Sequence, residues 1–281
     1  MTYDETTPIT AADMTFDVRS SGPDDGEPVI LLHGFPETSI SWSAVAPQLA
    51  GAGLRVIAPD QRGYSPGARP TEVADYATEV LAGDVIALAD ALGLDSFHLV
   101  GHDWGSAVAW CVAARHPDRL RTLTAVSVPH LAAYGAALKS DPDQQKRASY
   151  IGLLRQTGKA EDLLLEDGGR RLAAMYGDGV PAEQVAAYVA HLSEPGALTA
   201  SLNWYRAMKP DLASLPAVSV PTTFVWSDDD MAIGRLPAEQ CGDFVDADYR
   251  FVELPGISHW IPEQAPDALA AAIIARVQGP R

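Results

Sequence analysis

Cysteine is scarce in this chain of 281 residues, which contains two, Cys111 and Cys241. Two cysteines cannot build the disulfide framework of a small secreted protein, and neither lies in the Cys-x-x-Cys or Cys/His spacing that holds zinc. We therefore interpret both as buried thiols of a protein in the reducing cytoplasm. We predict no metal and no cofactor.

Long apolar runs and an excess of basic charge are also missing. The most apolar stretch, residues 268–277, is about half of the ~20 residues that a membrane-spanning helix needs, and the acidic first six residues do not resemble an export signal, so we expect neither export nor anchoring. Lys and Arg number 20 against 37 Asp and Glu, a net charge of −17. Because such a charge repels nucleic acid and anionic membranes, the predicted partner is a small molecule.

Apolar, strand-like runs alternate with helical patterns in the first half of the chain, which predicts a mostly parallel sheet buried on both faces. Strands are predicted at residues 14–19, 28–32, 55–58, 97–101, 123–128, 222–226 and 249–254, and helices at 84–92, 106–115 and 265–277. From residue 131 to residue 214 the periodicity is helical throughout. Residues 1–130 and 215–281 are therefore predicted to form one sheet domain, interrupted by a helical lobe at 131–214.

The motif richest in chemistry is Gly-His-Asp-Trp-Gly at residues 101–105, where a predicted strand runs directly into a helix. A turn this sharp needs small flanking residues and points its central side chain, Asp103, into a cleft. Esterases carry serine at this position. An aspartate instead predicts attack on an sp³ carbon, followed by attack of water on the resulting ester. The alternative is that Asp103 only caps the helix. We interpret Ser106 as a small packing residue.

Three further segments complete a reaction centre. The sequence of residues 29–36 indicates a buried strand that ends in a loop with Gly and Pro. In this loop the N–H of Phe35 could form an oxyanion hole together with the N–H of Trp104. His259 and the acidic triple 228–230 each follow a predicted strand. A neutral imidazole can deprotonate water while a carboxylate orients the ring, so the chain order predicts Asp103 as nucleophile, one of the triple as acid, and His259 as base.

Five other histidines are assigned no part in proton transfer: His33, which we expect to brace its loop by hydrogen bonds, and His102, His116, His130 and His191.

These motifs, His-Gly-Phe-Pro at 33–36, Gly-His-Asp-Trp-Gly at 101–105 and Gly-Ile-Ser-His-Trp at 256–260, resemble those of the epoxide hydrolases in the α/β-hydrolase superfamily. The likeness covers nearly the whole chain. It implies an α/β-hydrolase fold, with a mostly parallel central sheet of about eight strands and a helical cap inserted at the predicted lobe. It also implies Asp230 as the orienting acid, with Asp229 and Asp228 as fallback choices, and a monomer or a cap-mediated homodimer.

Epoxide hydrolases similar to this chain use two cap tyrosines to hydrogen-bond the epoxide oxygen and protonate the leaving alkoxide. Tyr205, within Asn-Trp-Tyr-Arg at 203–206, and Tyr150 match those positions. An alkoxide is a poor leaving group, and a phenol can donate the proton that it needs. We interpret Tyr134, Tyr176 and Tyr188 as packing residues.

The resemblance thus implies hydrolysis of an epoxide to a vicinal diol through an alkyl-enzyme ester on Asp103. A haloalkane or haloacid dehalogenase is the runner-up, because it shares the Asp-Trp elbow. Phe35 stands where many dehalogenases carry asparagine, which argues against halide binding. Ser106 replaces a glycine that is more usual in epoxide hydrolases, which weakly favours a dehalogenase. A ligand-binding protein that keeps the fold without turnover is the third hypothesis.

Overall fold

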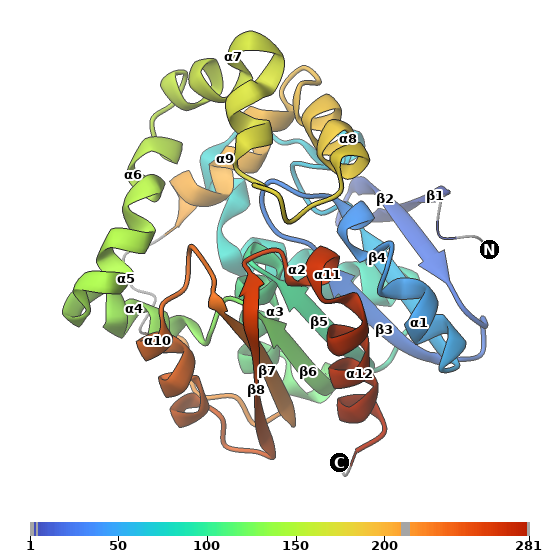
Figure 1. The fold of residues 1–281 in the computed structure, drawn as a ribbon. Helices are drawn as coiled ribbons and strands as arrows, with labels where there is room; N and C mark the ends of the chain where they lie inside the picture. The colour runs from blue at the N-terminus through green and yellow to red at the C-terminus, as the bar shows by residue number, and fades with distance from the viewer. Residues whose placement is uncertain (1–2, 4, 209–213, 280–281) are drawn as a thin grey trace.

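An eight-stranded sheet forms the centre of the computed structural model, which describes residue 3 and residues 5–208 and 214–279 (Figure 1). The strand order is β1-β2-β4-β3-β5-β6-β7-β8; β1 pairs antiparallel with β2 and β2 with β4, and the other pairs are parallel. The strands are β1 (Thr6–Ala11), β2 (Met14–Ser21), β3 (Glu27–Leu32), β4 (Leu54–Pro59), β5 (Phe97–His102), β6 (Leu120–Val126), β7 (Thr222–Asp229) and β8 (Tyr249–Ser258). The predicted fold class is confirmed.

Helices cover both faces of this sheet, which explains why its central strands are apolar without interruption. Along β3, Val29 and Leu31 belong to the core under α1 (Ala46–Gly51) and α12 (Pro266–Val277), whereas Ile30 and Leu32 belong to the core under α2 (Thr78–Ala91) and α3 (Trp104–Arg115). Successive side chains of a strand point to opposite faces, so a strand covered on both sides must be apolar at every position.

Between β6 and β7 the chain leaves the sheet and forms a helical layer on one side of it (Figure 1). This layer contains α4 (Leu131–Ser140), α5 (Pro142–Arg147), α6 (Ile151–Leu154), α7 (Lys159–Ala174), α8 (Ala182–Leu192) and α9 (Ala197–Ala207). Two further short α-helices are α10 (Arg235–Glu239) and α11 (Ile261–Gln264). Residues 209–213, at the end of the predicted lobe, lie outside the described residues. None of the described helices has the length and apolar character needed to span a membrane.

Several element bounds differ from the predicted ones for local physical reasons. The edge strand β1 was not predicted, because it is polar and contains Pro8, which only an edge strand tolerates readily. The strand predicted at 123–128 lies at Leu120–Val126 and stops before Ser127, whose φ is 67°. Helix α2 begins at Thr78, six residues before the predicted start.

Candidate active site

Asp103 lies at the turn between β5 and α3 with φ 52° and ψ −118°, a strained conformation for a residue with a side chain. Two glycines make this turn fit. A Cβ on Gly101 would lie 2.2 Å from the carbonyl oxygen of Gly105, and one on Gly105 would lie 2.1 Å from that of Leu32. Larger residues would therefore push α3 away from β3 and β5. The strained turn places the Asp103 carboxylate in the wall of two cavities.

Each oxygen of this carboxylate has its own neighbour. Oδ1 accepts a hydrogen bond from the N–H of Phe35 at 2.9 Å, and Oδ2 lies 3.4 Å from Nε2 of His259. Trp104 begins α3, so its N–H has no acceptor within the helix. The structure therefore brings the two predicted oxyanion residues and the predicted base to the predicted nucleophile.

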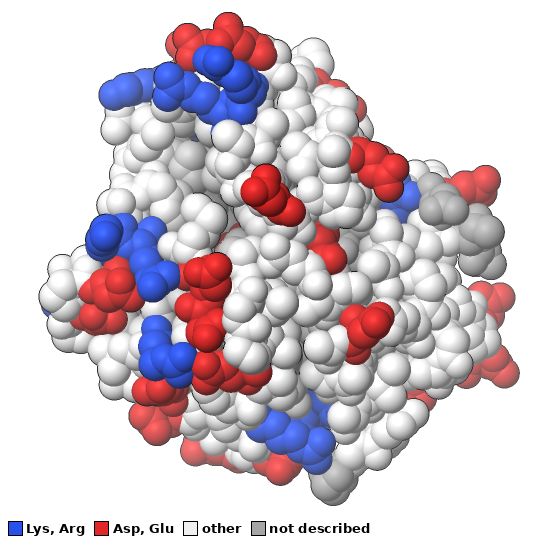
Figure 2. Space-filling model, viewed as in Figure 1, with Lys and Arg blue, Asp and Glu red and all other residues white. Residues whose placement is uncertain are grey.

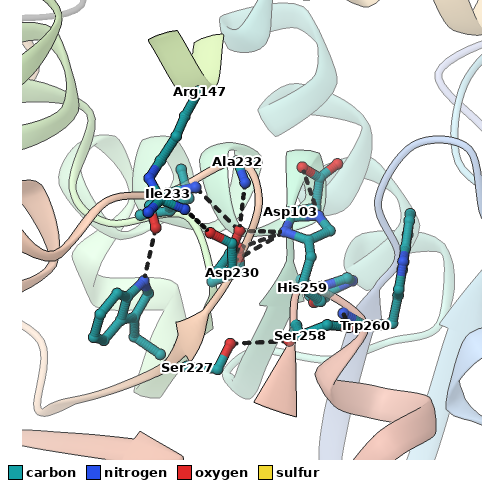
Figure 3. A network of polar contacts seen from close by, with 12 residues as sticks. Asp103, Arg147, Ser227, Asp230, Ala232, Ile233, Ser258, His259 and Trp260 are labelled. Atoms are coloured by element: carbon teal, nitrogen blue, oxygen red, sulfur yellow. Dashed lines mark hydrogen bonds and ion pairs between the residues drawn. The ribbon is translucent and has the colours of Figure 1, made fainter. Parts of the chain in front are cut away.

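The imidazole of His259 lies between two carboxylates (Figure 3). Its Nδ1 is 3.0 Å and 3.1 Å from the two oxygens of Asp230, which follows β7 and is fully buried. The fallback acids Asp228 and Asp229 are exposed. Burial by itself would lower the pKa of His259, but the carboxylates of Asp230 and Asp103 raise it well above its ordinary value. The ring is therefore a cation while Asp103 carries its charge.

Asp230 is held by donors that keep it ionised. Its carboxylate accepts from Ser127 Oγ at 2.7 Å and from the N–H groups of Ala232 and Ile233 at 2.7 Å and 3.0 Å, and Arg147 donates to its carbonyl oxygen (Figure 3). Burial raises the pKa of Asp230, yet His259, together with the hydrogen bonds from Ser127 and Ala232, brings it below its ordinary value. Ser127 was not predicted as part of the site, because its positive φ has no signature in the sequence.

Two cavities meet at Asp103, Tyr150, Tyr205 and Ala232, which line both. The larger has a volume of about 400 Å³ and apolar walls that include residues of α6 and α7. Half-exposed Arg171 also lines it, and Figure 2 shows this face hollowed below the basic side chains over α7. The smaller has a volume of about 50 Å³ and continues past Asp103 toward α4. A ligand bound over Asp103 therefore has room for a large group in the larger cavity and for a small group in the smaller one.

The phenol rings of Tyr150 and Tyr205 line the same two cavities as Asp103, with ring centroids 6.4 Å apart. Tyr205 also packs edge-on against Phe35 and Trp104, at 5.2 Å and 5.1 Å. Burial is the main cause that raises the pKa of both phenols, and the charge of Asp103 adds to it. Both hydroxyls therefore stay protonated at neutral pH and can act as donors toward the cavity.

A second buried network lies behind His259. Nδ1 of His102 is 3.0 Å from Oε2 of Glu37, and its Nε2 is 2.9 Å from the carbonyl oxygen of His259. Both partners are hydrogen-bond acceptors, so each ring nitrogen of His102 faces an acceptor oxygen. If both carboxyl groups are ionised, Glu37 Oε1 and Glu263 Oε2 have no hydrogen-bond donor among the described residues. A single proton on this pair allows one carboxyl group to donate a hydrogen bond to the other. The Tyr188 hydroxyl of α8 donates to Glu263 at 3.2 Å.

This carboxyl pair predicts a pH-dependent stability. Burial and the charge of Glu37 raise the pKa of Glu263, so the native protein keeps a proton that the unfolded chain loses above its ordinary carboxyl pKa. Stability should therefore fall as pH rises, by about 1.4 kcal/mol per pH unit while native Glu263 stays protonated. Glu263→Gln removes this loss of stability. In urea unfolding between about pH 5 and 9, the free energy of unfolding of the variant should increasingly exceed that of the wild type as pH rises. Exposed Glu183→Gln is the control, and parallel curves would contradict the expectation.

The other histidines that the sequence analysis set aside lie away from this chemistry. His33 braces its loop as expected: its Nε2 accepts the N–H of Gln61 at 3.1 Å, and Nδ1 contacts the carbonyl oxygen of Gly34 at 2.9 Å. His130 accepts the N–H of Ala132 and caps α4. His191 contacts the carbonyl oxygen of Tyr64.

The fold and this site define an α/β hydrolase, and a family model described as "alpha/beta hydrolase fold" matches residues 27–266. The chain is 35% identical to the AB hydrolase superfamily protein YfhM of Bacillus subtilis, over 90% of this chain and 91% of that protein. It is 31% identical to Epoxide hydrolase A of Mycobacterium tuberculosis, over 93% and 95%. A solved structure described as one of the novel epoxide hydrolases in metagenomes from hot environments matches with a TM-score of 0.88, 32% identity and full coverage of both chains. The chain therefore belongs to the epoxide hydrolase family of the α/β-hydrolase superfamily.

Proposed function

We propose that the protein hydrolyses an epoxide to a vicinal diol by way of a covalent ester on Asp103. One observation carries this proposal: two protonated phenols, Tyr150 and Tyr205, line the same cavity as a carboxylate at a nucleophile elbow. Substitution at an epoxide carbon breaks a C–O bond and leaves an alkoxide, which needs a proton. The relatives named epoxide hydrolases support the same reaction class.

In the first step, Oδ2 of Asp103, the oxygen that Phe35 N–H does not contact, attacks one ring carbon while a phenol of Tyr150 or Tyr205 donates its proton to the ring oxygen. The bond between that carbon and the ring oxygen breaks, its electron pair stays on the oxygen, and the phenol's proton converts this oxygen to a hydroxyl and leaves a phenolate. The product is an ester that joins Asp103 to the substrate. Because Phe35 N–H already contacts Oδ1, it is placed to hold the oxyanion formed when water attacks this ester.

Ester formation also activates the base. While Asp103 is a carboxylate, its charge and contact help to raise the pKa of His259, which is then a poor base. The ester removes that charge, so the pKa of His259 falls and the imidazolium gives up its proton, which restores the phenol used in the first step. The neutral ring can then take a proton from the attacking water. When the ester C–O bond breaks, this proton passes to the departing diol oxygen, and the carboxylic acid left on Asp103 returns a proton to His259. Asp230 stabilises the imidazolium that forms. The nucleophile thus controls when the histidine can act.

A cytoplasmic location and a homodimer stay predictions.

Removal of one phenol separates this reaction from its nearest alternative. Tyr205→Phe is expected to lower kcat for epoxide opening by about 10²-fold or more, because it removes a proton donor to the alkoxide. Release of halide from a matched alkyl halide needs no proton and should change by less than about threefold. Diol and halide formation by the same preparations measure the two activities.

The buried phenol of Tyr76 provides a matched control, since its hydroxyl donates to the carbonyl of Pro70 and the ring lines neither cavity. Tyr76→Phe should leave diol formation nearly unchanged. Efficient halide release by the wild-type protein, with no diol from any epoxide tested, would instead support a dehalogenase.

A further inference from the structure

Three tyrosines surround Asp103, whereas the proposed reaction uses two. The third, Tyr134 of α4, lines the smaller cavity together with Asp103, Tyr150 and Tyr205. It is 8% exposed, and its hydroxyl makes no hydrogen bond with any residue in the described ranges. Its ring packs in the hydrophobic core, as the sequence suggested, and the residue also lines this cavity. The hydroxyl oxygen is open to the cavity, so a ligand that enters there can accept its hydrogen bond.

The surroundings of Tyr134 limit what that partner can be. Apart from Thr78 and the groups already described, the smaller cavity is lined by apolar side chains such as Val128, Leu131 and Ile233. Its volume of about 50 Å³ admits a substituent of a few heavy atoms, compared with about 400 Å³ in the larger cavity. The negative charges nearby belong to Asp103 and Asp230, which disfavour an anion. A short, neutral group with an acceptor oxygen fits best.

We propose that Tyr134 donates a hydrogen bond to an oxygen on the short substituent of the epoxide, an inference that rests on the proposed function. The preferred substrates then carry a hydroxymethyl, ether or carbonyl group on one ring carbon and a longer apolar group on the other. The first occupies the smaller cavity and the second the larger. Tyr134 thereby selects the substrate and fixes which way the ring lies over Asp103.

The protonation state of Tyr134 suits this role. Burial raises its pKa, and the charges of Asp103 and Asp230 raise it further, so the phenol remains a donor throughout the neutral range. Tyr150 and Tyr205 line both cavities, whereas Tyr134 lines only the smaller of the two. Its hydroxyl is therefore available to a substituent, while the other two phenols act on the ring oxygen.

The test compares two epoxides of equal size. One carries a hydroxymethyl group on one ring carbon and a pentyl chain on the other, and in its analogue an ethyl group replaces the hydroxymethyl group. For the wild-type protein, kcat/KM should be about five- to tenfold higher for the epoxy alcohol, the effect of one neutral hydrogen bond. In Tyr134→Phe the ratio should fall to about one, through a higher KM for the alcohol with its kcat preserved. Tyr76→Phe should keep the wild-type ratio.

Each other outcome is decisive. Equal kcat/KM for the two epoxides in the wild-type protein would overturn the inference while diol formation upheld the proposed function, and this comparison needs no variant to fold. An equal fall for both substrates in Tyr134→Phe would also overturn it, because it would place the hydroxyl on the ring oxygen or in packing. Failure of the wild-type protein to hydrolyse either epoxide would reject the proposed function, and this inference with it.

Discussion

Asp103→Asn is expected to abolish epoxide hydrolysis, with a fall in kcat of at least about 10⁴-fold. The amide has nearly the shape of the carboxylate, but it is a far weaker nucleophile and cannot form the alkyl ester. The variant also loses the charge that holds His259 protonated, so the resting pKa of that imidazole should fall. Initial rates of diol formation measure the loss, and NMR titration of the imidazole measures the second effect.

Mass spectrometry tests whether Asp103 is the attacked residue. After rapid acid quench, the wild-type peptide that contains Asp103 should gain the mass of the substrate, and the variant should show no adduct. Asp229→Asn is the matched control, because this exposed aspartate lies outside the contacts of His259. It should retain wild-type activity. If Asp103→Asn kept activity within tenfold of the wild type, a covalent aspartyl mechanism would be untenable.

The sheet was predictable wherever burial dictates the residue type. Central strands such as β3 are covered on both faces, and their continuous apolar runs identify them from the sequence alone. The elbow was predictable because its close backbone approach at Gly101 and Gly105 excludes larger side chains. By contrast, β1 is stabilised by pairing with β2 at the sheet edge, where polar residues are tolerated, so its sequence carries little signal.

The order of chemical groups along the chain predicted which residues the site needs, but not how they are held. Asp103, His259 and one acid of the triple, Asp230, meet because they follow β5, β8 and β7, whose carboxyl ends lie at the same edge of one parallel sheet. Ser127 contacts Asp230 because of a backbone conformation that the neighbouring residues in the sequence do not predict. Supporting contacts of this kind follow from the fold and could not be derived before it.

Contacts between distant segments were the least predictable. Glu37 lies in the loop after β3, His102 ends β5 and Glu263 lies in α11, and each would be an ordinary polar residue if read alone. Their significance arises from the common burial that forces them to share protons. The same holds for Tyr134, whose surplus hydroxyl is recognisable only when the cavity beside Asp103 is known.

His259→Gln should stop the reaction after its first half. Attack by Asp103 on the ring needs the carboxylate and the phenols, whereas attack of water on the ester needs the imidazole as base. The variant should therefore consume about one epoxide per protein molecule and accumulate the ester, while steady-state diol formation falls by about 10²- to 10⁴-fold. Intact-mass measurement during a single turnover should show nearly complete modification.

The half-buried loop residue His116 supplies the control for this substitution, because it lies at the end of α3 and away from both carboxylates. His116→Gln should turn over normally and accumulate no ester. In the wild-type protein, hydrolysis of the ester should accelerate as pH rises through the pKa that His259 has once Asp103 is esterified, and in His259→Gln this rise should vanish. An ester that decays equally fast in both proteins would show that another group activates the water, and the roles assigned to His259 and Asp230 would then be wrong.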